Sequence, residues 1–434
     1  MPKPDQTQHS KDSEIEIDIS QLRPGVHVRI PGSWLTHGFM FNSFVITDEV
    51  QVRQIASLKL PKLYSDPSRC KVDPLPRQAN PVVPVTLLPT NDPATPLVKN
   101  SMTKVYQERT NITAILRRRL NTTHRHYAEA VIAVNNAFKF IDSEPKKSMM
   151  QVAEVSEKSI AELLADPDSA ITLITEKGQY EGQAAHAMSV MTLAQLLGKQ
   201  AGLTEDALHV IGVGALLHDI GKLTFHSSVL LNTHRNSFEE SVYRSHCRVG
   251  YDKALLAGGL SSEMLDIILH HHECFDAKGF PDQLKGEKIA LATRIVSIAN
   301  RFDNIINPID PYHSKLPSQA LGVMWSKEKD RFDKTLLQLF IRAMGVYPPG
   351  SIVLLSDQRI GVVVASTSVV NSVSPQVLIY ERNVPRHEAA ILDLTQETLI
   401  KIERPLSLKE RTEEELEYLL PRRKIRWSFY RKRS

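Results

Sequence analysis

The chain has few of the features that mark secreted, membrane or nucleic-acid-binding proteins. Its 434 residues include only three cysteines, Cys70, Cys247 and Cys274. They lie far apart without a CxxC spacing, which argues against a disulfide framework or a thiolate zinc site and fits a reducing compartment. No apolar run approaches the roughly 20 residues that cross a bilayer. The polar start MPKPDQTQHSKDSE also lacks the apolar region of a secretory signal.

Positive and negative charges are nearly balanced, with 53 Lys and Arg against 49 Asp and Glu. The formal net charge is +4, which gives no strong general attraction to nucleic acid or to a membrane surface. We therefore expect a cytoplasmic protein without a transmembrane segment, for which nucleic acid is not the partner.

What the chain does have is a change of pattern along its length. Alternating apolar residues near the start predict strands, recurring prolines predict a linker, and long helical periodicities follow. After Tyr347 the pattern returns to strands. We expect a mainly α protein, with an all-helical core preceded by a small strand-rich domain and followed by a short β-extension. The expected parts are a strand-rich domain with its Pro-rich linker (12–100), a connecting helix (101–145), the helical domain (146–345), the β-extension (346–420) and a basic tail (421–434). The tail either keeps the protein soluble or binds acidic lipid or nucleic acid.

The segment ALLHDIGKL places His218 and Asp219 side by side in an otherwise apolar helix. A hydrogen-bonded core histidine would explain one of the two groups, but further histidines occur on other predicted helices: His186, His246, His271 and His272. Imidazole and carboxylate ligands suit iron, manganese, zinc or nickel better than calcium or magnesium. Adjacent helical residues diverge by about 100°, so such a pair serves two neighbouring ions better than one, with Asp219 as the bridge.

Lys222 follows His218 by four residues, which puts it on the same face of a continuing helix. An ammonium group beside a metal pair can hold a phosphate oxygen and offset the charge that develops there. The alternative is a helix-terminal lysine that complements the helix dipole, with Gly221 helping to end the helix.

Two motifs together resemble the HD-GYP family. HDIGK (His218–Lys222) and HHECFDAKGFP (His271–Pro281) are similar to its HD pair and its HHExxDGxGYP signature, with Phe280 in place of the tyrosine and Ala277 in place of the first glycine. The similarity covers residues 146–345, including LKGEKIALATRIVSIANRFDNI, and extends into YPPGSIVLLSDQRIGVVV. Upstream, LRPGVHVRIPGSWLTHGFMFNSFVI resembles a domain of unknown function that commonly precedes these enzymes.

The resemblance implies an all-helical, HD-type metal-dependent phosphohydrolase that hydrolyses cyclic di-GMP to pGpG, GMP or both. A hydroxide bridging two divalent ions would attack phosphorus; iron or manganese is favoured, with zinc or nickel as alternatives. The implied ligands are His186, His218, Asp219, His246, His271, His272 and Asn300. Asp219 and Lys222 would be catalytic, and the implied substrate contacts are Lys222, Gly279, Arg294 and Lys315. Implied partners are cyclic di-GMP and, through the GYP-like loop, a diguanylate cyclase or other signalling proteins; an oligomer is compatible with the sequence.

Three positions depart from the family pattern. Asn300 stands where the last metal-binding aspartate is usual, and its neutral oxygen is a weaker ligand; Asp303 is a nearby substitute. Gly182 stands where some members have a glutamate for a third ion, so we expect two ions. The segment NPIDPYHSK lacks the arginine that grips phosphate and offers only His313 or Lys315. The alternative function is therefore a degenerate member that binds nucleotide or protein without turnover.

Overall fold

The computed structural model describes residues 14–30, 43–57, 62–76, 96–165, 170–174, 182–367, 374–397, 399–421 and 425–430. The chain forms two compact units, Met1–Thr103 and Lys104–Ser434. Most of the predicted Pro-rich linker lies outside the described residues.

The first unit contains a four-stranded antiparallel sheet in the order β1-β4-β2-β3. Its elements are β1 (Ile15–Ile17), β2 (His27–Arg29), β3 (Ser43–Val45), α1 (Glu49–Ser57) and β4 (Leu63–Ser65). The alternating apolar residues of SFVITDEVQV predict a strand that runs past residue 49, but α1 begins there. Oδ1 of Asp48 accepts a hydrogen bond from the backbone N–H of Gln51 at 2.9 Å. This is a helix-starting contact, and the Asp-x-x-Gln spacing is its sequence signal.

The second unit is built on packed helices, the first of which, α2 (Pro96–Phe140), enters it at Lys104. The others are α3 (Pro145–Leu164), α4 (Gln183–Gln200), α5 (Glu205–Leu217), α6 (Ser227–Leu231), α7 (Ser237–Arg244), α8 (His246–Ala257), α9 (Ser262–His270), α10 (Leu291–Ile306), α11 (Pro317–Lys327), α12 (Lys334–Met344) and α13 (Glu413–Leu419). Helices α4 and α5 lie at the centre, where α4 packs against α5 and α10. The expected fold class, a helical core with strand-rich regions before and after it, is confirmed.

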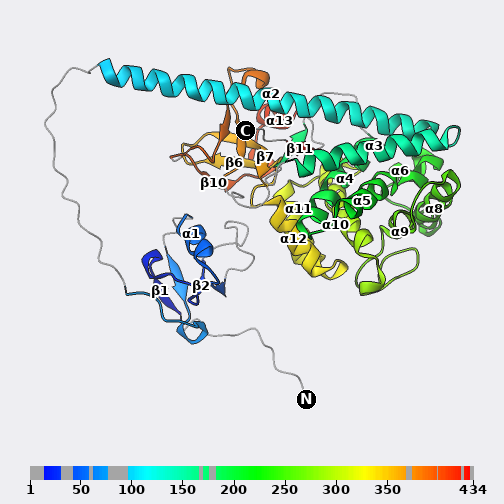
Figure 1. The fold of residues 1–434 in the computed structure, drawn as a ribbon, viewed down its shortest axis with the longest axis horizontal. Helices are drawn as coiled ribbons and strands as arrows, with labels where there is room; N and C mark the ends of the chain where they lie inside the picture. The colour runs from blue at the N-terminus through cyan, green and yellow to red at the C-terminus, as the bar shows by residue number, and fades with distance from the viewer. Residues whose placement is uncertain are drawn as a thin grey trace. The chain divides into compact units, whose positions relative to one another are not determined.

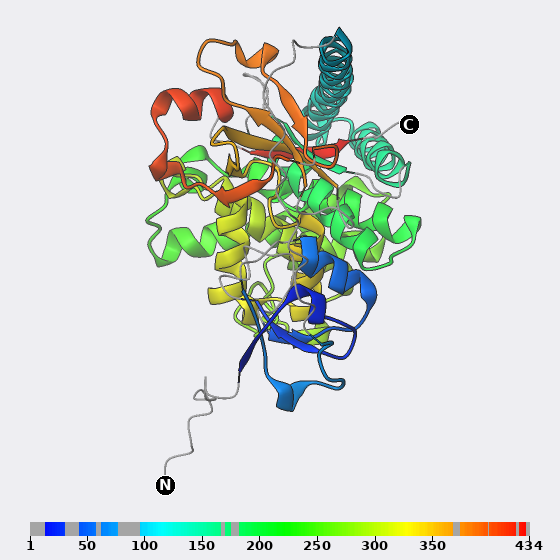
Figure 2. The same cartoon turned by 90° about the vertical axis from the view of Figure 1, so that its left-hand side faces the viewer.

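A seven-stranded sheet packs beside these helices (Figures 1 and 2). Its strands are β5 (Ala170–Ile174), β6 (Ile352–Leu355), β7 (Ile360–Thr367), β8 (Gln376–Ile379), β9 (Ile391–Asp393), β10 (Ile402–Pro405) and β11 (Arg426–Tyr430). They form the path β10-β6-β7-β5-β11, with β8 pairing β7 and β9.

Two of these strands correct our expectations. Strand β5 lies inside the region expected to be all-helical, and β11 lies inside the expected basic tail. The two pair antiparallel, with Trp427 opposite Leu173 and Phe429 opposite Ile171. All four of these side chains are buried. Because alternate residues of a strand face the same side, the apolar residues of this otherwise basic segment reach the core together.

The long helix α2 runs along the second unit (Figure 1) and is joined to the sheet by side-chain hydrogen bonds. Nε2 of His124 donates to the carbonyl of Leu173 in β5 at 3.2 Å. Thr113 and Arg117 donate to the carbonyls of Ile391 and Ala389. Among the described residues, no helix is long and apolar enough to cross a membrane.

Candidate metal centre

The site is centred on Asp219, whose two carboxylate oxygens face different histidines. Nε2 of His218 and of His186 lie 3.4 and 3.6 Å from Oδ2. Nε2 of His246 and of His271 lie 3.4 and 3.5 Å from Oδ1. The side chains thus divide into two groups that share only this carboxylate.

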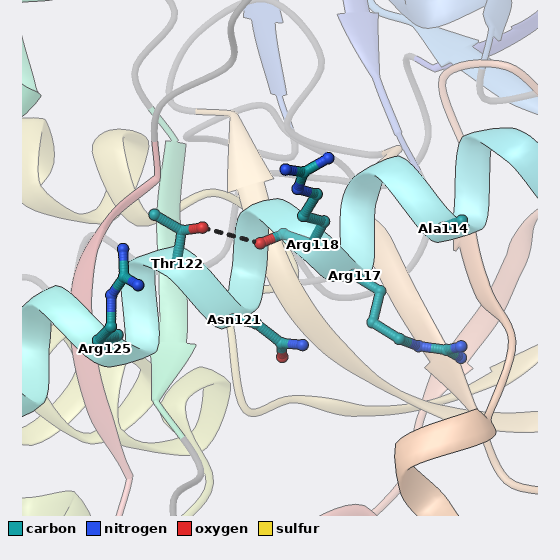
Figure 3. Close-up of a pocket in the computed structure, with 6 residues that line it drawn as sticks. All are labelled: Ala114, Arg117, Arg118, Asn121, Thr122 and Arg125. Atoms are coloured by element: carbon teal, nitrogen blue, oxygen red, sulfur yellow. Dashed lines mark hydrogen bonds between the residues drawn. The ribbon is translucent and has the colours of Figure 1, made fainter.

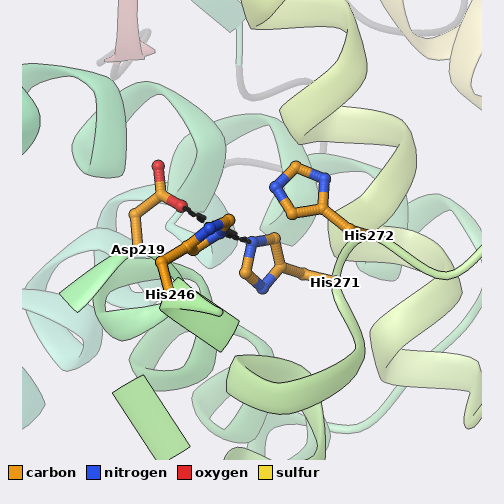
Figure 4. A group of neighbouring side chains, drawn as sticks. All are labelled: Asp219, His246, His271 and His272. Carbon is orange, nitrogen blue, oxygen red and sulfur yellow. Dashed lines mark hydrogen bonds and ion pairs between the residues drawn. The ribbon is translucent and has the colours of Figure 1, made fainter. Parts of the chain in front are cut away.

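One group is Asp219, His246, His271 and His272, whose side chains converge in Figure 4. The other is His186, His218 and Asp219. Within each group every residue offers one nitrogen or oxygen atom, and these atoms all lie within 4.8 Å of one another. Two groups of three or four donors with one shared carboxylate are the arrangement that a pair of ions needs.

The ring orientation of three of these histidines is set by Nδ1, the ring nitrogen that faces away from Asp219. Nδ1 of His218, His246 and His271 lies 2.7, 2.6 and 3.0 Å from the carbonyl oxygen of the residue three positions earlier. A carbonyl oxygen only accepts hydrogen bonds, so each Nδ1 carries the proton. Each Nε2 therefore keeps a lone pair that can bind a metal. Metal-bound histidines are held in this way in proteins generally.

The donors fit a metal because several of them otherwise lack a partner. Among the described residues, the buried atoms without a hydrogen bond include Nε2 of His218, Oδ1 of Asp219 and Nε2 of His272. Leaving such polar atoms unpaired in a protein interior costs on the order of 1–3 kcal/mol each. Cations bound between them would satisfy all three.

The charges of the site also suit cations. Burial lowers the pKa of His271 to about 3 and that of His272 well below its usual value, so both rings are neutral and able to ligate. Burial alone would raise the pKa of Asp219, but the positive charge of Lys222 holds it well below its ordinary range. The central carboxylate is therefore ionised.

The two adjacent pairs do not diverge as a continuous helix would make them. Helix α5 ends at Leu217 and His218 is its C-cap, while Asp219 leaves the helix with φ −101° and ψ 12°. Likewise His271 is the C-cap of α9. Each pair therefore places both of its side chains in one group, which contradicts our argument from a helical separation of about 100°.

Lys222 also lies in a different local structure from the one expected. It belongs to a short 3-10 segment, Ile220–Thr224, and its Nζ reaches Oδ2 of Asp219 at 2.6 Å. The ammonium group also lies 5.3 Å from the centre of the Tyr243 ring. The side chain is 15% exposed. The lysine is thus at the site, although not on the helical face from which we placed it there.

The other predicted residues have varied surroundings. Asn300 is buried on α10, and its Oδ1 accepts a hydrogen bond from Nδ2 of Asn304 at 2.7 Å. Arg294 pairs with Asp333 at 2.7 Å, and Lys315 is exposed. These contacts engage Asn300 and Arg294 with neighbours outside the two ligand groups.

Gly279 has a packing role that is visible in the backbone. A Cβ atom there would lie 2.3 Å from the backbone nitrogen of Cys274 and 2.4 Å from Cα of Glu273. Only glycine fits this approach, which folds the loop back on the residues that follow the two histidines. The Glu273 carboxylate holds the loop's far end by accepting the N–H groups of Asp282 and Leu284 at 2.7 and 3.0 Å.

Three further side chains lie at the site, and two of them, Phe280 and Arg244, were not predicted as ligands or substrate contacts. The ring of Phe280 stacks on His272 with centroids 4.6 Å apart, and the Arg244 guanidinium lies 5.0 Å from the centre of the Phe280 ring. Asp303 accepts from Nδ1 of His186 at 2.6 Å; the sequence placed it near the site but only as a substitute for Asn300. Arg244 lies outside the two motifs, so no local signal pointed to it.

A separate pocket of about 400 Å³ lies on α2 and is lined by Ala114, Arg117, Arg118, Asn121, Thr122 and Arg125. In Figure 3 Arg118 and Arg125 extend to one side of the helix, and Arg117 extends to the other. The pocket shares no residue with the two ligand groups.

Comparison with known proteins matches the chain to two family models. Residues 158–336 match the HD domain, and residues 14–152 match a domain of unknown function, DUF3391. A cyclic di-GMP phosphodiesterase of Pseudomonas aeruginosa is 26% identical over 80% of this chain and 80% of its own length. A cyclic di-GMP phosphodiesterase response regulator of Xanthomonas campestris is 31% identical over 37% of this chain and 43% of its own length.

A 3′3′-cGAMP-specific phosphodiesterase of Vibrio cholerae is 26% identical over 38% of this chain and 36% of its own length. The chain therefore spans most of the Pseudomonas relative but less than half of the other two. These matches confirm the resemblance drawn from the two motifs and from the upstream segment. Residues 158–336 of this chain are thus similar to HD domains, and residues 14–152 are similar to the DUF3391 domain.

Proposed function

We propose that this protein is a metal-dependent phosphodiesterase that hydrolyses cyclic di-GMP to pGpG, GMP or both. One observation carries the proposal: each oxygen of the buried Asp219 carboxylate faces its own set of histidines. The relatives named as cyclic di-GMP phosphodiesterases supply the substrate class.

The residues proposed to hold two divalent ions are the members of the two groups defined above. The nitrogen-rich donor set favours iron or manganese over the harder ions magnesium and calcium. When bound, such a pair lowers the pKa of water and stabilises the negative charge that develops on a phosphate under attack.

The chain's own groups would then perform three tasks. Asp219 would hold the two ions together, since its oxygens reach both groups. Lys222 would contact the scissile phosphate, because its ammonium group lies beside the Asp219 carboxylate and near the face of the Tyr243 ring. Phe280, stacked on His272, offers an apolar ring surface beside the ligands for a nucleobase.

The alternative of a protein that binds nucleotide without turnover is not supported by the relatives, which are named as phosphodiesterases. A different substrate has more support, because the Vibrio cholerae relative is named for 3′3′-cGAMP. Both dinucleotides present a phosphodiester between two nucleosides, so the metal site by itself does not separate them.

The test uses the full chain purified without oxygen and loaded with Mn²⁺ or Fe²⁺. It is incubated separately with cyclic di-GMP and with 3′3′-cGAMP, and linear products are followed by chromatography. We expect metal-dependent release of pGpG or GMP from cyclic di-GMP. Chelator-treated protein and an Asp219→Ala variant are the controls. Tight binding of cyclic di-GMP with no linear product would contradict the proposal, and preferential cleavage of 3′3′-cGAMP would change its substrate.

A further inference from the structure

We infer that the C-terminal strand β11 is part of the metal centre, with Arg426 as a positioning residue that acts through Asp303 on His186. An effect of Arg426 on turnover rests on the proposed function. An effect of Arg426 on metal binding does not, and metal binding can be measured separately.

A continuous set of contacts joins the three residues. Nδ1 of His186 lies 2.6 Å from Oδ2 of Asp303. Nη1 of Arg426 lies 3.1 Å from each oxygen of the same carboxylate. The side chains of Asp303 and Arg426 are only 1% and 10% exposed. A buried ion pair is therefore placed directly behind one ligand.

The start of the strand is tied to the same helix by a second set of bonds. Nδ2 of Asn307 donates to Oδ1 of Asp303 at 2.9 Å and to the carbonyl of Ile425 at 2.8 Å. The N–H of Ile425 donates back to Oδ1 of Asn307 at 2.7 Å. The Trp427 ring stacks on Phe302 of α10, with centroids 5.6 Å apart. Residues 425–427 are thus docked on α10 beside Asp303.

His186 differs in this respect from the other oriented ligands. His218, His246 and His271 each use a carbonyl of their own chain segment, three residues earlier. His186 instead depends on a side chain 117 residues away in sequence, and that side chain depends on Arg426, a further 123 residues along. Among these four histidines, His186 is therefore the one whose ring orientation depends on β11.

The effect should reach only one of the two ions. His186 faces Oδ2 of Asp219 together with His218, whereas His246 and His271 face Oδ1. Without Arg426, Asp303 would be a buried carboxylate deprived of its cation, which is strongly destabilising for that arrangement. Losing a partner that orients a metal ligand typically lowers metal affinity about 10- to 100-fold.

The experiment titrates the full chain with Mn²⁺ alone and follows binding by calorimetry and by electron paramagnetic resonance. Arg426→Met preserves the length of the side chain and removes its charge; Arg426→Lys restores a charge without the guanidinium. For the wild type we expect two ions and a spin-coupled spectrum. For Arg426→Met we expect one ion bound as before, the other bound about 10- to 100-fold more weakly, and loss of the coupled signal. Arg426→Lys should lie between them.

The matched control is Arg411→Met, because Arg411 is a partly buried arginine of the C-terminal region paired with Glu415 at 3.5 Å. It should bind two ions like the wild type. Normal binding of both ions by Arg426→Met, or equal weakening of both, would overturn the inference. If Arg426→Met does not fold, Arg426→Lys decides: unchanged binding of both ions overturns the inference, and selective weakening of one supports it.

Failure of the proposed function would look different. A wild-type protein that binds two Mn²⁺ ions but cleaves neither dinucleotide would contradict the proposed function and leave the role of Arg426 standing.

Discussion

Nζ of Lys222 lies 2.6 Å from Oδ2 of Asp219, so a partly buried ammonium group contacts the carboxylate that both histidine groups share. Burial alone would lower the pKa of Lys222, but Asp219 and Tyr243 raise it above its ordinary value, so the side chain is charged. The pair places a fixed positive charge at the point where we propose that phosphate binds.

Replacing Lys222 should separate chemistry from metal binding. Because an ammonium group is not a metal ligand, Lys222→Ala should keep two ions per chain and lose on the order of 100-fold or more in turnover of cyclic di-GMP. Lys222→Arg should recover only part of the rate, since a guanidinium is larger and planar. Metal content, melting temperature and rate are measured on the same preparations. Loss of metal together with activity would make Lys222 structural, and unchanged activity would remove its catalytic role.

Asp219→Ala should abolish both metal loading and hydrolysis. Its two oxygens lie within 3.6 Å of ligand nitrogens from both groups, so its loss should cost more than the loss of one terminal histidine. His246→Ala is the matched comparison, because it removes one donor from a single group. Near-normal turnover of Asp219→Ala would show that the carboxylate does not hold the ions together.

Elemental analysis of anaerobically purified protein should approach two ions per chain. This number is expected because the donors divide into two groups and because the family resemblance implies that Gly182 stands where a glutamate would hold a third ion. A reproducible value near three would show that a further group completes another site.

The stability of the second unit should fall in acid partly because of His124. Burial lowers the pKa of this imidazole to about 4, from an ordinary value of 6.5. The unfolded chain therefore takes up a proton first as the pH falls, and stability is lost between about pH 6.5 and 4, by at most about 3 kcal/mol. His124→Gln should lose less stability over this window in urea titrations at pH 7 and pH 5. The neighbouring His126, which is 47% exposed, is the control. Equal acid sensitivity of His124→Gln and His126→Gln would contradict the prediction.

Ala277→Gly should stabilise the loop that follows the two histidines. Ala277 has φ 64°, a left-handed conformation that costs a residue with a Cβ atom about 1–2 kcal/mol. Glycine removes this cost but loses more conformational entropy on folding. The free energy of unfolding should therefore rise by no more than about 1 kcal/mol. Ala161→Gly, on the exposed face of α3, should instead destabilise by about 1 kcal/mol. A shift of the same sign in both variants would point to a general effect of glycine rather than to φ at residue 277.

Sequence patterns located the helical core well, because apolar periodicity over long segments is a strong signal. They missed β5 and β11, which are five residues each. The basic residues around Trp427 and Phe429 led us to predict a tail rather than a strand, although the two aromatic residues alternate with other residues. Only the pairing with β5 shows that both rings are buried.

The sequence by itself determined which residues can bind metal, since ligand chemistry belongs to the side chain and the HD and HH pairs are local. It could not determine which Asp219 oxygen faces which histidine, because that depends on α5, α8 and α9 converging. It also placed Lys222 on a continuing helix, whereas the chain leaves the helix at His218. Only the tertiary structure brought Asp303 and Arg426 behind His186, because contacts between residues more than 100 positions apart are set by how helices and strands pack rather than by spacing along the chain.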